Sequence, residues 1–111
     1  MATRRMTIGR IGEDITAGFL ERRGAVIVER NVRVGRGEID LLIELGGERI
    51  AVEVKTGTSA SARPEENFGD DKERRVRRAA NDLTPPVWRV DLVTVVLTGR
   101  GATVRWVPDV S

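Results

Sequence analysis

Two carboxylates and one lysine are spaced in this chain so that they could do chemistry together. Twelve residues separate Asp40 from Glu53, and Lys55 follows two residues after Glu53. A pair of neighbouring carboxylates can chelate a divalent cation, and an amine beside them can orient water or neutralise charge on a phosphate. Because the chain contains 17 Arg but only two Lys, a lysine at this position is a specific feature. The three side chains predict metal-assisted hydrolysis of a phosphodiester bond.

The amino-acid composition excludes most other catalytic chemistry. The chain contains no Cys, His or Tyr, which rules out disulfides, thiolate zinc sites, thiol nucleophiles, imidazole ligands and Ser-His-Asp triads. Ligands that are only oxygen favour Mg²⁺ or Mn²⁺ as the cofactor. The formal charge is +2, and the Arg side chains suit phosphate. A GC-rich coding bias would explain the excess of Arg over Lys equally well, so composition alone favours a nucleic-acid partner only modestly.

The length and hydropathy of the chain predict its general class. Its 111 residues are expected to form a single domain, residues 1–111. No apolar run approaches the ~20 residues that span a bilayer, and the first ten residues contain no apolar signal-peptide core. We therefore expect a cytoplasmic protein without a membrane partner.

The apolar periodicity predicts an α/β protein with the order α-β-β-β-α-β-β. A first helix over 7–23 carries an apolar stripe and has Thr7 as its expected N-cap. The second helix is expected over 70–83, after a mobile loop over 57–69. We expect strands over 25–34, 38–45, 49–56, 88–98 and 102–107. Trp88 and Trp106 are expected in the core. The first-helix stripe consists of Ile8, Ile11, Ile15 and Phe19.

The Gly46-Gly47 turn predicts how the second and third strands pair. A symmetric two-residue hairpin pairs Leu45 with Glu48, and therefore Asp40 with Glu53. Opposed residues have Cβ atoms about 4.5–5.5 Å apart, where like charges repel unless a cation binds both. The same register pairs Glu38 with Lys55.

Strand alternation predicts which side chains of this hairpin share a face. The charged residues point one way together with Leu42 and Ala51, and the other aliphatic residues point the other way. One face is therefore expected to be apolar and the other charged. The alternative is a solvated outer face on which Glu38 and Lys55 form an ordinary cross-strand ion pair.

Basic residues on the second helix are candidates for binding a phosphate backbone. Arg74 and Arg78 share a face at i,i+4 spacing, with no acidic residue expected to balance them there. A solvated helix is the alternative. Asn31 and Arg33 would contact phosphate or simply end the first strand. Asp91 would support the site or pair with Arg89. The nucleic-acid-binding candidates are Asn31, Arg33, Lys72, Arg74, Arg75 and Arg78.

Short motifs along nearly the whole chain resemble those of the YraN-like proteins, small bacterial proteins of uncharacterised role. They are Gly9-x-x-Gly12-Glu13-x-x-x-Ala17, Arg30-Asn31-x-Arg33, Gly37-Glu38-Ile39-Asp40-Leu41, Val52-Glu53-Val54-Lys55, Lys72 and Arg89-Val90-Asp91. That family looks like a minimal member of the PD-(D/E)XK restriction-endonuclease-like superfamily, with a layout close to archaeal Holliday-junction resolvases.

The resemblance implies a fold and a role for each site residue. The fold would be a restriction-endonuclease-like mixed β-sheet flanked by helices. Asp40 and Glu53 would be catalytic metal ligands, Lys55 the catalytic lysine and Glu13 a further metal ligand. The chain departs from the superfamily motif in having Ile39, not proline, before Asp40. It departs from the family in having Gly57 where an Arg is common.

These observations together predict a Mg²⁺- or Mn²⁺-dependent endonuclease. We expect DNA rather than RNA as the substrate, branched DNA by analogy with the resolvases, and a homodimer because so small a chain has little surface with which to hold a duplex. One alternative is a non-catalytic nucleic-acid-binding module with the same fold. Another is an interaction subunit that dimerises through the first-helix stripe.

Overall fold

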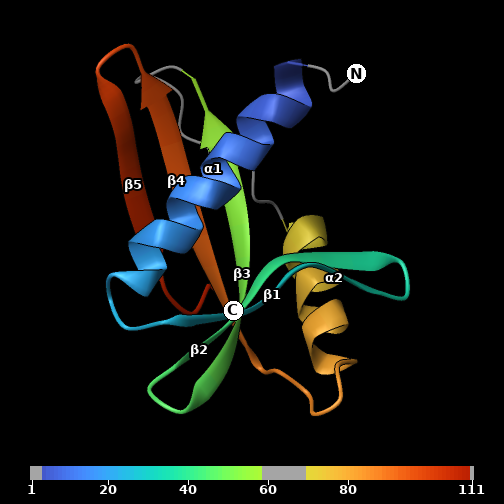
Figure 1. Cartoon of the computed structure of the whole chain (residues 1–111). Coiled ribbons are helices and arrows are strands. Elements are labelled where there is room, and N and C mark those ends of the chain that lie inside the picture. The colour runs from blue at the N-terminus through green and yellow to red at the C-terminus, as the bar shows by residue number, and fades with distance from the viewer. Residues whose placement is uncertain (1–3, 59–69, 111) are drawn as a thin grey trace.

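The computed structural model describes residues 4–58 and 70–110, with no account of the side chains of residues 4–7 and 70 (Figure 1). The elements are α1 (Arg4–Glu21), β1 (Val26–Val34), β2 (Gly37–Leu45), β3 (Glu48–Gly57), α2 (Asp70–Asn81), β4 (Arg89–Thr98) and β5 (Gly101–Val107). The predicted α/β order is confirmed, and every strand boundary lies within one residue of its prediction. Residues 59–69 of the predicted mobile loop lie outside the described part.

The five strands form one mixed sheet in which spatial order follows chain order, β1-β2-β3-β4-β5. Strands β3 and β4 are parallel, and all other neighbours are antiparallel. A parallel pair needs a crossover connection, and the segment that contains α2 makes it. No helix in the described ranges is long and apolar enough to cross a membrane.

The two helices cover opposite faces of this sheet (Figure 1). Ala17 and Leu20 of α1 pack in one cluster with Leu41 and Ile43, whereas α2 packs in a second cluster that includes Leu42. The prediction that one face of the β2–β3 hairpin is apolar and the other charged is therefore wrong in the middle of the sheet. Since α2 covers the second face, Leu42 and Ala51 are buried there.

A glycine sets how closely α1 approaches the sheet. A Cβ atom on Gly12 would lie 1.8 Å from Oγ1 of Thr56 on β3, so only glycine fits at this contact. The face that α1 buries runs through Gly12, Thr16 and Leu20, whereas Ile11 of the predicted stripe is 41% exposed. Ile15 and Phe19 of the stripe are partly buried against the same cluster as Leu20, and the close approach at Gly12 leaves Ile11 on the outer side of the helix.

The ends of α1 also differ from their predictions. The helix begins at Arg4, so Thr7 lies inside it and is not its N-cap. It ends at Glu21 before Gly24, whose φ of 95° lets the N–H of Ala25 donate to the carbonyl of Leu20 at 3.0 Å. This reversal of the chain leads directly into β1.

The β1–β2 hairpin bends at the point where Asp40 lies. A β-bulge interrupts β1 between Ile27 and Glu29, and Asn31, which the register places opposite Asp40, has a φ of 52°. Ile39 packs in the α2 cluster but Leu41 in the α1 cluster, so strict alternation fails at Asp40. The bent tip of the hairpin reaches over α2 (Figure 1).

A close contact holds this bent tip against α2. A Cβ atom on Gly37 would lie 2.8 Å from the Cβ of Ala79, so a larger residue would push the tip away from the helix. The bend and this contact together turn β2 away from β3 at Asp40.

Asp91 stabilises the start of β4 and the end of the chain. Its fully buried carboxylate accepts hydrogen bonds from Nε of Arg89 at 2.9 Å, from Nε1 of Trp106 at 2.8 Å and from the backbone N–H of Asp109 at 2.8 Å. Of the two predicted roles for Asp91, pairing with Arg89 is the one observed. Trp106 is partly buried as expected, but Trp88 is 70% exposed because it precedes β4 and lies outside both clusters.

Candidate functional site

The hairpin register brings Asp40 and Glu53 to the place where β2 and β3 separate. The ladder runs from Leu45–Glu48 to Leu41–Val52, as predicted, and ends there. Asp40 and Glu53 lie one position beyond its last pair. The N–H of Val54 donates instead to Oδ2 of Asp40 at 2.8 Å. The carboxylate of Asp40 thus takes the place of a backbone acceptor and is held in the gap between the strands.

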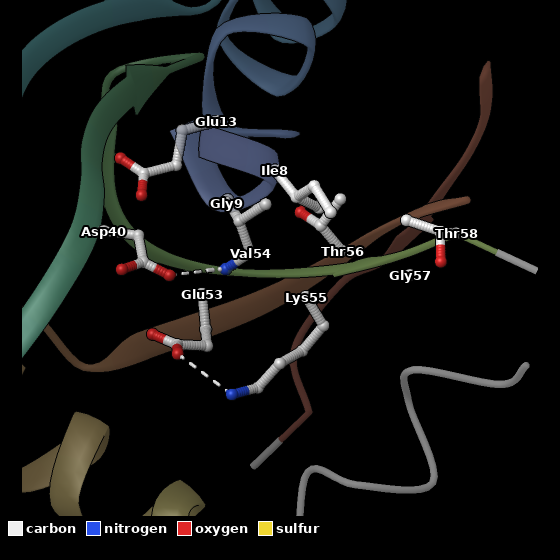
Figure 2. Close-up of a pocket in the computed structure, with 10 residues that line it drawn as sticks. All are labelled: Ile8, Gly9, Glu13, Asp40, Glu53, Val54, Lys55, Thr56, Gly57 and Thr58. Atoms are coloured by element: carbon white, nitrogen blue, oxygen red, sulfur yellow. Dashed lines mark hydrogen bonds and ion pairs between the residues drawn. The ribbon is translucent and has the colours of Figure 1, made fainter. Parts of the chain in front are cut away.

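Figure 2 shows Asp40, Glu53 and Lys55 around this gap, with Glu13 of α1 on the other side of β3. Asp40 and Glu53 line the same cavity and interact electrostatically. Nζ of Lys55 lies 3.6 Å from Oε1 of Glu53, and these two side chains are only 20% and 14% exposed. The predicted grouping of two acids and an amine is therefore present in the fold.

The predicted alternative, a solvated Glu38–Lys55 ion pair, does not fit this geometry. Lys55 forms its ion pair with Glu53, and Glu38 lies opposite Arg33 of β1 in the register. The bend at Asp40 carries Glu38 away from β3 with the hairpin tip. Since Lys55 is mostly buried, its position is that of a site residue and not of a surface charge.

Burial and mutual repulsion make this pair of acids unfavourable as charged groups. Burial, followed by the charge of Asp40, raises the pKa of Glu53 to about 8. Burial also raises the pKa of Asp40, against the opposing effect of the Val54 N–H. The two carboxyl groups therefore resist carrying two negative charges side by side. A bound cation would remove this conflict.

The acids line a cavity of about 460 Å³ between α1 and the edge where β2 leaves β3. Its lining includes Glu13, whose pKa is raised by burial and then by the charges of Asp40 and Glu38. Glu13 therefore faces the same cavity as Asp40. In residues 8–58 and 71–110, no three acidic side chains converge closely enough to hold one ion. Glu13 thus lines the site without joining Asp40 and Glu53 in a three-carboxylate cluster.

The donor set nevertheless suits a hard divalent cation. Mg²⁺ prefers oxygen, keeps several waters and needs only one or two carboxylates from the protein. Val54 adds a further oxygen, because the N–H and C=O of one strand residue leave on the same side and its N–H points to Asp40. The oxygen atoms on the side of β3 that faces β2 thus come from Asp40, Glu53 and the Val54 carbonyl.

The predicted nucleic-acid-binding residues lie on α2 and on the bent hairpin. Lys72, Arg74, Arg75 and Arg78 are exposed along α2, and Asn31 and Arg33 are exposed on β1. The second cavity, of about 500 Å³, is lined by Asp71, Arg74, Arg75 and Arg78. The expectation that no acid balances this face is wrong, since Nη2 of Arg74 lies 2.7 Å from Oδ1 of Asp71.

Several residues of the site were not found from the sequence. Thr56, Gly57 and Thr58 line the cavity beside Lys55, as do Ile8 and Gly9 of α1. Gly12 could have predicted where α1 approaches the sheet. Its contact with Thr56 places the next residue, Glu13, at the cavity. Nothing in the sequence pattern pointed to the Val54 N–H as the group that holds Asp40.

A family model and individual relatives assign this chain to the same protein family. The model of the uncharacterised protein family UPF0102 matches residues 12–95. A UPF0102 protein of Dictyoglomus turgidum is 34% identical over 106 residues, covering 89% of this chain and 90% of its own length. A UPF0102 protein of Pseudarthrobacter chlorophenolicus is 40% identical, covering 87% and 79%. One from Arthrobacter sp. strain FB24 is 41% identical, covering 85% and 86%. This chain therefore belongs to the uncharacterised protein family UPF0102.

Proposed function

We propose that this protein is a divalent-metal-dependent endonuclease that hydrolyses phosphodiester bonds of DNA. The observation that carries the proposal is that two interacting, largely buried carboxyl groups, Asp40 and Glu53, line one cavity, with an ammonium 3.6 Å from one of them. The motif resemblance to the PD-(D/E)XK superfamily supports the same assignment, as does a mixed sheet with a helix on each face. Membership of the UPF0102 family does not by itself indicate an activity.

The metal would bind Asp40 and Glu53. Both carboxyl groups open onto one cavity, both have raised pKa values, and the chain has no imidazole or thiolate that would favour a softer ion. When bound, Mg²⁺ or Mn²⁺ would lower the pKa of a coordinated water and neutralise charge on the phosphate. The Val54 N–H fixes the carboxylate of Asp40 so that its second oxygen remains available.

Lys55 would act on the substrate directly. Its ion pair with Glu53 keeps the ammonium at the mouth of the carboxylate pair, where it can orient the attacking water and neutralise the phosphate. In the reaction the water oxygen forms a bond to phosphorus and one P–O bond to a sugar breaks. The products are a phosphate monoester and a free hydroxyl, whose proton balances the one lost by water.

The exposed basic surface of α2 and the hairpin would hold the DNA backbone. Arg75 and Arg78 line a cavity on α2, and Arg33 lies on the hairpin tip that leans over this helix. Such side chains contact phosphates without reading sequence, so we infer recognition of DNA shape. Branched DNA is the expected preference by analogy with the resolvases. A homodimer would supply the surface that one chain lacks.

A cleavage screen tests this proposal. Linear, nicked, flapped and four-way DNA, closed-circular plasmid and matched RNA would be incubated with Mg²⁺ or Mn²⁺ and either wild type or Lys55→Met. We expect metal-dependent cleavage of DNA, including the plasmid, that falls about 10²-fold or more in Lys55→Met. Arg49→Met, an exposed change at the far end of β3, is the matched control. DNA binding with no cleavage of any substrate would reject the endonuclease and favour the non-catalytic binding module.

A further inference from the structure

The only two lysines of the chain come together in space. Lys72 is the third residue of α2, one helical turn before Val76, which packs in the cluster that contains Ala51 of β3. Ala51, Glu53 and Lys55 lie on one face of β3 by alternation, and Figure 2 shows Glu53 and Lys55 pointing away from Glu13 of α1. Lys72 therefore lies on the α2 side of the sheet, the side toward which Glu53 and Lys55 point.

Electrostatics agree with this placement. The nearness and the charge of Lys55 lower the pKa of Lys72, and the charge of Glu53 opposes that effect. The two amines and the Glu53 carboxyl thus form one group of charges built from β3 and α2. Lys72 is exposed to solvent, so its amine can reach a ligand that enters from outside.

Helix stability does not account for a lysine here. A cation in the first turn of a helix opposes the helix dipole, and a second ammonium beside it adds repulsion. Both effects are unfavourable in the free protein. Both are reversed when an anion with several oxygens binds between the two amines, so the arrangement suits a phosphate.

We propose that Lys72 is a second catalytic lysine, which with Lys55 holds the scissile phosphate against a single divalent cation on Asp40 and Glu53. This inference rests on the proposed endonuclease function. Two-metal nucleases place a second ion about 3.5–4 Å from the first, bridged by further carboxylates. Here no three acidic side chains among residues 8–58 and 71–110 gather to hold an ion, and the ammonium of Lys55 lies beside Glu53.

The test compares Lys72→Met with wild type, with Lys72→Arg, which keeps the charge, and with the control Arg49→Met. Arg49 lies six residues before Lys55 on β3, or about 20 Å away. We expect Lys72→Met to lower the single-turnover cleavage rate about 10²-fold and to reduce the salt dependence of DNA binding by about one counterion. Lys72→Arg should recover part of the rate, and Arg49→Met should keep the wild-type rate.

Metal stoichiometry provides a readout that is independent of cleavage. Calorimetric titration with Mn²⁺ should give one ion per chain in wild type and in Lys72→Met, with affinity equal or tighter in the variant because a nearby cation has gone. Two ions per chain, or Lys72→Met cleaving within threefold of wild type, would overturn this inference and leave the endonuclease intact. Wild type that cleaves no substrate would instead reject the endonuclease, and the role of Lys72 with it.

Discussion

Metal binding should expel a proton from Glu53, and the number expelled should depend steeply on pH. In the metal-free protein the pKa of Glu53 is about 8, raised by burial and by Asp40. At pH 7 this carboxyl is therefore about 0.9 protonated, and at pH 9 about 0.1. A metal ion can bind only the charged form, so each Mn²⁺ should release about 0.9 proton at pH 7 and about 0.1 at pH 9.

The same proton makes the apparent affinity for the metal depend on pH. Because deprotonation must precede ligation, affinity should rise about tenfold between pH 7 and pH 9 and level off above the pKa of Glu53. The apparent metal affinity rises with pH because the raised pKa of Glu53 keeps this carboxyl protonated at neutral pH. The proton competes with the metal below pH 8 and ceases to compete above it.

Isothermal titration calorimetry in two buffers of very different ionisation enthalpy measures the released proton directly. Wild type should give buffer-dependent heats at pH 7 and nearly buffer-independent heats at pH 9. Glu53→Gln should lose most metal affinity, and Glu44→Gln, an exposed change on β2, should behave as wild type. Identical heats in both buffers at pH 7, together with an affinity that does not change between pH 7 and pH 9, would show that metal binding releases no proton from Glu53.

Three further predictions concern stability and follow from individual contacts. Asp91→Asn breaks the ion pair between Arg89 and the fully buried carboxylate of Asp91, and it should lower the free energy of unfolding by about 3 kcal/mol in urea titrations; a loss under 1 kcal/mol would contradict the contact. Gly12→Ala places a Cβ against Thr56 and should lower the free energy of unfolding by about 1–3 kcal/mol. Adding Thr56→Ala should restore part of this loss. Equal stability of the single and double variants would argue against the clash. In the metal-free protein, Glu53→Gln should be more stable than wild type at pH 9 by up to a few kcal/mol. The raised pKa of Glu53 makes wild type lose stability as the pH rises from about 4.5 to 8. Thermal denaturation at pH 5 and pH 9 measures this, and an equal difference between the two proteins at both pH values would contradict it.

The element order and the hairpin register could be predicted because they depend on local sequence. The Gly46-Gly47 turn alone determines that Leu41 pairs with Val52, and this register carries Asp40 toward Glu53. The type and spacing of the two acids and Lys55 predict that these three side chains lie together, and they line one cavity in the structure.

The remaining features depend on contacts between distant elements. The change of face at Asp40 follows from a bulge and a positive φ in β1, which no periodicity in β2 reveals. Burial of the second face depends on α2, and the orientation of α1 depends on one glycine against Thr56. The approach of Lys72 to Lys55 likewise arises only once the crossover lays α2 on the sheet.

The most direct test of this account is an anomalous-scattering map from crystals grown with Mn²⁺. The proposed metal site should give one strong peak per chain, about 2.0–2.3 Å from an oxygen of Asp40 and an oxygen of Glu53. A map at millimolar Mn²⁺ with no peak between these two carboxylates, or with the ion bound by only one of them, would contradict it.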